Sequence, residues 1–297
     1  MKIIIFLMIF IGQSFASPYL FKFYPKGTKV VGIGAFNLEN EREFEKGEDI
    51  IENLTLSGTG LNFLYGHYLS EKDYLEISIS ALAGKYEEVY SHELAYLGNR
   101  DNKVFGVREP VITYLRKFNT VDDHHYNHGL KIAYSPSFNM AKQTNFMRGH
   151  HELEINYWFS YRRKNYEMAG QLYSRYFTEK KIELSDMGSE RSSPYSEVGI
   201  ELMPAFIYNE FAIRAIGGTG NTTDYNTKND QIERKSDKGF SVYGGGSLEY
   251  DNEDFAANLT FIASSYVFNS IDEDMARDVD FEFENREISL NFLWRLR

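Results

Sequence analysis

Apolar and polar residues alternate along most of this chain, and the last stretch shows the pattern most clearly. From 288 to 296 every second residue is apolar, starting at Ile288 and including Trp294, while the residues between them are mostly polar. A period of two residues is that of a β-strand with one apolar face. A strand at a chain end frays unless a neighbour holds it. The pattern therefore predicts a closing strand that pairs with another part of the chain.

The same alternation recurs upstream, so that the sequence predicts an all-β protein with about twelve antiparallel strands. Polar or glycine-rich connections separate the segments. The predicted strands span about 29–38, 54–69, 73–84, 104–118, 126–140, 149–162, 165–178, 196–208, 210–218, 239–250, 254–268 and 288–296. In the fourth segment, we assign Val107, Val111, Thr113 and Leu115 to the apolar row.

The connections alternate in length. Short polar turns are predicted at 70–73, 119–125, 163–165, 208–210 and 251–254, and longer loops at 39–53, 85–103, 141–148, 179–195, 219–238 and 269–285. This order places both termini on the side of the short turns. Short turns at one end and longer loops at the other are typical of a membrane β-barrel, with the short turns facing the periplasm.

Aromatic residues flank the short turns and the last strand. Rings at one level on successive strands are typical of a girdle at a membrane interface, although strand ends favour aromatic residues in any case. The predicted periplasmic girdle consists of Tyr68, Tyr74, Phe118, Tyr126, Tyr161, Tyr166, Tyr208, Phe211, Tyr250, Phe255 and Trp294.

The amino terminus has the pattern of a secretory signal. Lys2 precedes an apolar run from Ile3 to Gly12, and Ser14 and Ala16 follow as small residues at a cleavage point. The run is too short to span a bilayer, which needs about 20 apolar residues. We therefore expect a signal peptide at 1–16 and one barrel domain at 17–297. The stretch 17–27 is expected to form no more than a tail or a small cork.

Composition narrows the possible partners. The chain has no cysteine, so it forms no disulfide and has no cysteine for acylation. Its formal net charge is −11, which argues against nucleic acid as a partner because phosphates attract basic patches.

Together these features resemble bacterial outer-membrane β-barrel proteins over residues 17–297. The resemblance implies a closed antiparallel transmembrane barrel in a Gram-negative outer membrane, with lipid, lipopolysaccharide and the outer-membrane assembly machinery as partners. It rests on pattern and not on a motif. Members usually end in Phe or Trp, whereas Arg297 is last here. A soluble secreted β-sandwich would share the alternation, but it has no reason to sort its loops by length.

In such a barrel, the polar face of each strand lines the lumen. The predicted lumen or constriction residues are Glu76, Lys131, Glu152, Glu154, Gln171, Arg175, Glu197, Glu201, Arg214, Glu249 and Arg295. Two interpretations stay open. The carboxylates form a constriction that prefers cations, or the same residues form an ion-paired network that fills the lumen.

The sequence favours a narrow channel or porin for small solutes with mild cation preference. The alternative is a closed structural or surface-interaction barrel that works through acidic outer loops at 39–52 and 269–284, where divalent cations could bind. No cofactor is predicted and no residue is assigned as a metal ligand. A lipid-modifying enzyme is a third hypothesis. Known barrel hydrolases place His and Ser two residues apart, and no His-x-Ser occurs here, so no catalytic residue is assigned.

Overall fold

The computed structural model describes residues 23–46, 49–90, 100–118, 126–137, 150–184, 188–229, 233–236, 238–272 and 277–297. The predicted signal peptide at 1–16 lies outside these ranges and stays a prediction, as do the predicted turn at 119–125 and the predicted loop at 141–148. Within the described ranges, no helix is long and apolar enough to cross a bilayer.

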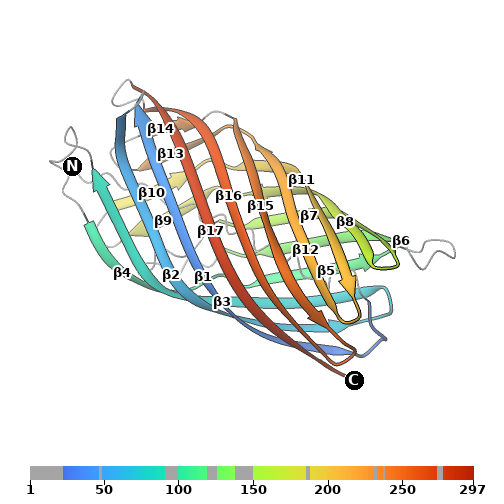
Figure 1. Ribbon diagram of the computed structural model, residues 1–297. Helices are drawn as coiled ribbons and strands as arrows, with labels where there is room; N and C mark the ends of the chain where they lie inside the picture. The colour runs from blue at the N-terminus through green and yellow to red at the C-terminus, as the bar shows by residue number, and fades with distance from the viewer. Residues whose placement is uncertain are drawn as a thin grey trace.

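All regular elements are strands, and Figure 1 shows them as one tilted barrel. They are β1 (Lys29–Lys46), β2 (Asp49–Tyr68), β3 (Asp73–Tyr90), β4 (Arg100–Val107), β5 (Val111–Lys117), β6 (Tyr126–Ser135), β7 (Glu152–Arg163), β8 (Tyr166–Phe177), β9 (Lys180–Leu184), β10 (Gly188–Ser192), β11 (Tyr195–Tyr208), β12 (Phe211–Thr222), β13 (Tyr225–Asn229), β14 (Glu233–Ser236), β15 (Gly239–Asp251), β16 (Phe255–Asp272) and β17 (Arg277–Leu296).

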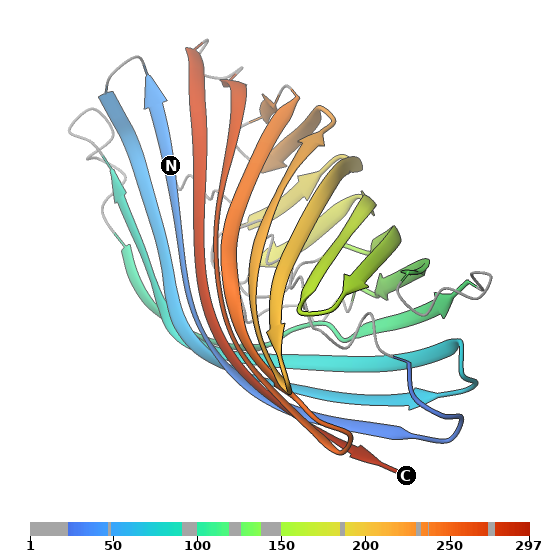
Figure 2. The ribbon, with the colours of Figure 1, turned by 45° about the vertical axis from the view of Figure 1, so that its right-hand side comes forward.

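The barrel is closed, antiparallel and twelve-stranded, as predicted. Successive barrel strands pair with one another: β8 pairs with β11 and β12 with β15, because the short strands β9, β10, β13 and β14 lie between them in the chain. The last strand, β17, pairs with β1, with Lys29 opposite Leu296. In both views of the ribbon, β1 and β17 lie side by side (Figures 1 and 2). β4 and β5 are successive parts of one barrel strand, because both pair with β3. Pairing of the first and last barrel strands closes the sheet on itself, which is the arrangement that a bilayer requires.

A bulge separates β4 from β5 and corrects one prediction. Ala81 of β3 lies opposite Val107, and Ser78 lies opposite Val111, so that four steps on one strand face three on the other. One extra residue switches the inward and outward faces. After the bulge, Thr113 and Leu115 are buried and Ile112 is exposed. The predicted apolar row through Thr113 and Leu115 was therefore wrong beyond Val107.

The outer ends of the strands are longer than predicted. The acidic stretch at 39–52 is mostly strand, since β1 runs to Lys46 and β2 begins at Asp49. In the same way, β16 runs to Asp272 and β17 begins at Arg277. Charged residues on both faces broke the apolar alternation, but their backbones still pair across the sheet. Short strands β9, β10, β13 and β14 continue the wall where loops at 179–195 and 219–238 were expected.

The short turns gather at the end of the barrel where the chain finishes, at the lower right of Figure 1. Two of them, at Lys164 and Asn209, need a left-handed backbone, with φ of 53° and 54°. Asn tolerates this conformation better than most residues, and a two-residue hairpin turn commonly requires it. We call this the periplasmic end, following the sequence-based topology.

The outward face of the barrel is apolar. Leu172, Val198 and Ile213 are each more than half exposed, and similar residues point outward from every barrel strand. A soluble protein does not leave so continuous an apolar surface uncovered. On a closed barrel, such a surface faces lipid while the other face lines the lumen.

Candidate functional site

The candidate site is the lumen. The alternation places every predicted lumen residue on the inward face, and most of them are buried there. These residues are Glu76, Lys131, Glu152, Glu154, Gln171, Arg175, Glu197, Glu201, Arg214, Glu249 and Arg295. Their role in conduction stays a prediction, whereas their contacts with one another are visible.

Glu154 of β7 is the hub of a network that crosses three strands. Its two carboxylate oxygens accept from Lys131 Nζ at 2.8 Å and from Arg175 Nε at 2.7 Å. Asn156 Nδ2 also donates to Glu154, at 2.7 Å. Lys131 lies on β6 and Arg175 on β8, because inward residues of neighbouring strands stand opposite one another. Buried charges at these distances hold each other in place.

Two further carboxylates continue the network onto β11. Arg175 Nη1 lies 3.5 Å from Glu197, which also accepts from Tyr173 OH at 3.1 Å. Glu201 accepts from Gln171 Nε2 at 2.8 Å, and in the described part of the chain it has no cation within 4 Å. The cluster therefore contains three carboxylates, Glu154, Glu197 and Glu201, against two cations.

A second ion-paired group lies nearer the periplasmic end. Arg214 of β12 donates to both carboxylate oxygens of Glu249, at 2.9 and 3.2 Å, which is a bidentate arrangement. The same guanidinium contacts Glu167 at 3.1 Å and the Met203 carbonyl at 3.1 Å. Here too the carboxylates outnumber the cation. At the mouth itself, Arg295 pairs with Asp251 at 2.7 Å.

The bulge between β4 and β5 adds inward charges that the sequence analysis missed. Arg108 and Glu109 are consecutive, yet both are buried, with 3% and 2% exposure. The Arg108 amide donates to the Ser80 carbonyl at 2.7 Å, which fixes the bulge on β3. Arg108 is close enough to act electrostatically on Glu287 of β17. Two adjacent charged residues followed by Pro110 were the signal for this feature in the sequence.

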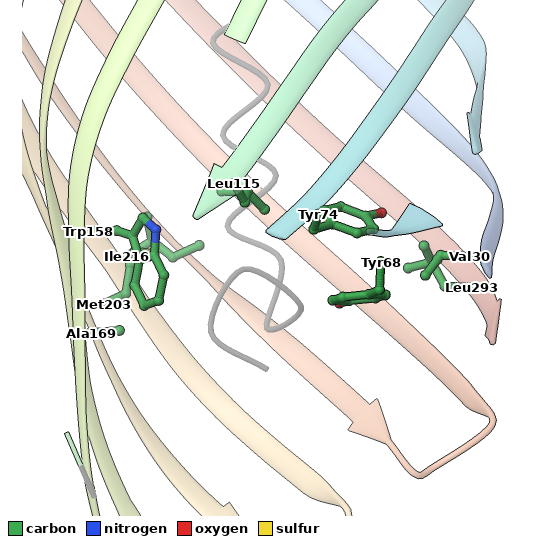
Figure 3. Close-up of a cluster of buried hydrophobic side chains, with 9 residues drawn as sticks. All are labelled: Val30, Tyr68, Tyr74, Leu115, Trp158, Ala169, Met203, Ile216 and Leu293. Carbon is green, nitrogen blue, oxygen red and sulfur yellow. The ribbon is translucent and has the colours of Figure 1, made fainter. Parts of the chain in front are cut away.

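An apolar belt surrounds the lumen at the periplasmic end (Figure 3). We define it as nine buried residues drawn from β1, β2, β3, β5, β7, β8, β11, β12 and β17. Figure 3 shows Trp158, Met203, Ala169 and Ile216 on one side and Tyr68, Tyr74, Val30 and Leu293 on the other, with Leu115 between them. An apolar constriction can resist the passage of water and ions by dewetting.

The belt corrects part of the predicted girdle. Tyr68 and Tyr74 are 2% and 6% exposed and point inward, because each is one step out of phase with the lipid-facing row of its strand. Tyr161, Tyr166, Tyr208, Phe211 and Trp294 are exposed. Phe118, Tyr126, Tyr250 and Phe255 share their outward phase and are half-buried. Several of these rings touch across strands, as Phe211 and Tyr250 do at 5.0 Å. Their interfacial role stays a prediction.

Among the described residues, no three His, Asp or Glu side chains are arranged to hold a metal ion. The binding of divalent cations at the acidic outer hairpins stays a prediction. Chemically, the lumen offers ion pairs and an excess of carboxylate groups.

No family model matches the sequence, and no curated protein matches it. Solved structures do resemble the fold. An outer membrane channel from Pseudomonas putida F1 aligns with a TM-score of 0.54 and 12% identity, covering 93% of this chain and 98% of that one. The β domain of the Bordetella autotransporter BrkA aligns with a TM-score of 0.45 and 9% identity, covering 89% and 99%. The closed twelve-stranded barrel and the first of these likenesses together show that the chain has the fold of a bacterial outer-membrane β-barrel protein.

Proposed function

We propose that the protein is a bacterial outer-membrane channel for small solutes, with a mild preference for cations. The observation that carries this proposal is the inner wall, where Glu154, Glu197 and Glu201 outnumber Lys131 and Arg175 on a barrel with an apolar outer surface. Carboxylates in a low-dielectric wall attract cations and repel anions. The fold of an outer-membrane channel from another bacterium fits the same role, although fold alone does not fix function.

The experiment is a reversal-potential measurement on purified protein in planar bilayers under a KCl gradient. The wild type is expected to conduct in steps and to favour K⁺. In the variant E197Q/E201Q, the preference falls toward none because two lumen charges are lost. E87Q is the matched control, because Glu87 is exposed and pairs with Lys85 outside the lumen. Loss of preference in E87Q as well, or no steps from the wild type, would count against the proposal.

The main rival is a surface-interaction barrel that works through its acidic outer hairpins. The supporting observation is the register of β1 and β17, which sets Glu41 opposite Glu284 and Glu43 opposite Glu282. Like charges directly opposite destabilise a strand pair. Divalent cations shared with lipopolysaccharide phosphates would relieve this repulsion. Under this rival, removing calcium and magnesium weakens retention on lipopolysaccharide vesicles, while conductance is absent with or without them.

A further inference from the structure

The described chain begins with a short segment that turns back into the barrel just before β1. Thr28 N donates to the Pro25 carbonyl at 3.2 Å, and Gly27 has a φ of 93°. This is a type II turn, in which the third residue needs a positive φ and is usually glycine. Gly27 N also donates to the Tyr68 carbonyl at 2.9 Å, and Tyr68 N donates to the Thr28 carbonyl at 2.9 Å. The end of β2 therefore holds the turn and aims Phe23 and Tyr24 at the periplasmic mouth.

Phe23 lies in a site made of aromatic rings and one cation. Its ring stacks on Trp158 of the apolar belt with centroids 5.9 Å apart and planes 17° apart. Tyr68 meets it edge-on at 6.1 Å, and Lys117 Nζ lies 6.0 Å from its centroid. Stacked and edge-on contacts are the geometries that aromatic pairs prefer, and a cation near a ring adds attraction.

Tyr24 is held next to it. Its ring meets Tyr68 edge-on at 5.5 Å, and the guanidinium of Arg295 lies 4.4 Å from its centroid. Asp251 pairs with Arg295 and fixes the guanidinium. Two rings of the segment are therefore seated against residues from β2, β7 and β17.

Two cavities lie next to this aromatic pair. The outer one measures about 650 Å³ and is lined by Phe23, Tyr24 and the acidic turns at 210 and 251–254. The inner one measures about 50 Å³ and is lined by belt residues such as Tyr68, Tyr74 and Leu115, together with Arg295. The two cavities share no lining residue, and Tyr68 and Arg295 of the inner one touch Phe23 or Tyr24. Phe23 and Tyr24 therefore line the outer cavity and also touch two residues that line the inner one.

We propose that the periplasmic mouth contains a binding site for a small uncharged aromatic molecule, and that Phe23 occupies this site as an internal ligand. A solute with a benzene-sized ring competes for the stack on Trp158 and displaces the segment, with Gly27 as the point about which it turns. An uncharged ring fits because the belt around it is apolar and desolvation of a charge there is costly. The claim that this displacement opens the lumen rests on the proposed channel function, whereas binding of the aromatic molecule to the site does not.

Fluorescence of Trp158 tests the site directly. The chain has two tryptophans, so W294F leaves Trp158 as the only one. In this background, F23A is expected to shift Trp158 emission to longer wavelength, because water replaces the ring. Toluene then reverses the shift with saturation, since an apolar cavity left by a side chain binds a ligand of its shape. With Phe23 present, toluene binds at least about tenfold more weakly, which corresponds to 1.4 kcal/mol.

The matched control is F211A, which removes a Phe from the lipid-facing surface of the same end. This variant shows any effect of toluene that arises from its partitioning into the detergent, and we expect its Trp158 emission to match that of the W294F background. Cyclohexane, a ring of similar size without π electrons, should reverse the F23A shift less well than toluene. If F23A and F211A give the same emission and the same toluene response, the site does not exist and the proposal is overturned.

Conductance tests whether Phe23 and Tyr24 block the periplasmic mouth. F23A/Y24A is expected to conduct several-fold more than the wild type, and toluene lowers the conductance of F23A toward the wild-type value. Heat-modified migration on SDS gels confirms that the variants are folded. Conductance that is present but unchanged in F23A/Y24A overturns the role of the segment as a plug. If no variant conducts while the Trp158 response is as expected, the channel function fails and the ring site stands.

Discussion

The inward faces of β7, β8 and β11 carry ion pairs, whereas the inward faces of β1 and β2 carry none in their described residues. On the first side, which we call the charged wall, Glu154, Arg175 and Glu197 link three strands. On the second, the small-residue wall, glycine, asparagine and aliphatic residues, together with Phe36 and Tyr68, alternate with lipid-facing ones. The lumen is therefore lined asymmetrically, with carboxylates on one side and uncharged residues on the other.

The two walls also use space differently. On the small-residue wall, the Phe36 ring lies against Gly60 and the phenol end of Tyr74 lies against Gly66, because a Cβ added at either glycine would clash with these atoms. The glycines let side chains from neighbouring strands lie against the backbone. On the charged wall, side chains meet each other end to end and hold their positions by charge. Packing by shape and packing by charge should fail in different ways when one residue is changed.

The largest effect is expected on the charged wall. Arg175→Ala leaves Glu154 and Glu197 without a shared cation, and breaking a buried pair in this way costs about 3 kcal/mol. Urea unfolding in phospholipid vesicles measures the change. Arg286→Ala is the control, because Arg286 pairs with Glu284 on an exposed surface where a pair contributes about 0–1 kcal/mol. Equal losses in the two variants would remove the energetic distinction between the walls.

The next effect tests packing by shape. Gly60→Ala on the small-residue wall places a Cβ 2.1 Å from the Phe36 ring and 2.5 Å from the Ala81 carbonyl, and overpacking of this kind costs about 1–3 kcal/mol. Gly217→Ala is the control, since its Cβ meets nothing closer than 3.9 Å. Thermal midpoints in detergent compare the two. A Gly60→Ala midpoint as high as that of Gly217→Ala would show that the neighbours of Gly60 move aside at little cost.

A smaller effect is expected above the small-residue wall. Glu43→Gln keeps an acceptor for Asn53 Nδ2, which lies 3.0 Å from Glu43, and removes one charge opposite Glu282. Relief of the repulsion should stabilise the barrel by about 0.2–1 kcal/mol at low salt. The gain should disappear in about 1 M salt, where the Debye length is about 3 Å. A gain that persists at high salt would point to packing and not to charge.

The smallest effect lies in the turn between β2 and β3. Ser70 donates to Asp73 at 2.6 Å and Tyr114 donates to it at 2.5 Å, and these hydrogen bonds hold the Asp73 pKa below its usual value. A carboxyl whose folded pKa is lowered stabilises the fold above its unfolded pKa of about 3.9, and this stability is lost as pH falls through the folded value. Asp73→Asn should cost about 0.5 kcal/mol at pH 7 and nothing at the acid end. Unfolding curves at several pH values give the slope, and a wild-type-like slope in the variant would contradict the assignment.

The number of strands and the inward or outward orientation of most residues could be predicted from the sequence, because apolar residues at every second position are a strong signal. The rows through Leu61 and Ile155 fixed the phase of β2 and β7 without ambiguity. These rows place Tyr68 and Trp158 inward, and the row through Ile77 of β3 does the same for Tyr74. The error over Tyr68 and Tyr74 came from giving their nearness to a turn more weight than their phase along the strand. Phase is the stronger guide, since one step along a strand reverses the face.

Other features had weak or no signals in the sequence. The bulge at Arg108–Pro110 replaces the alternation by two consecutive inward charges. The prediction assumed that one alternation continues along the whole strand, so it assigned the wrong face after the bulge. The outer ends of β1 and β17 are charged on both faces, and only their cross-strand pairing shows that they are strands. The seat of Phe23 on Trp158 joins residues far apart in the chain, so that nothing local could indicate it.

The seam between β1 and β17 is among the longest ladders in the barrel, running from Lys29 opposite Leu296 to Glu45 opposite Asp280. The two strands that meet there are the first and the last strand of the described residues. Opening the barrel between β1 and β17 would therefore break 17 residue pairs, whereas opening it between β5 and β6 would break 6.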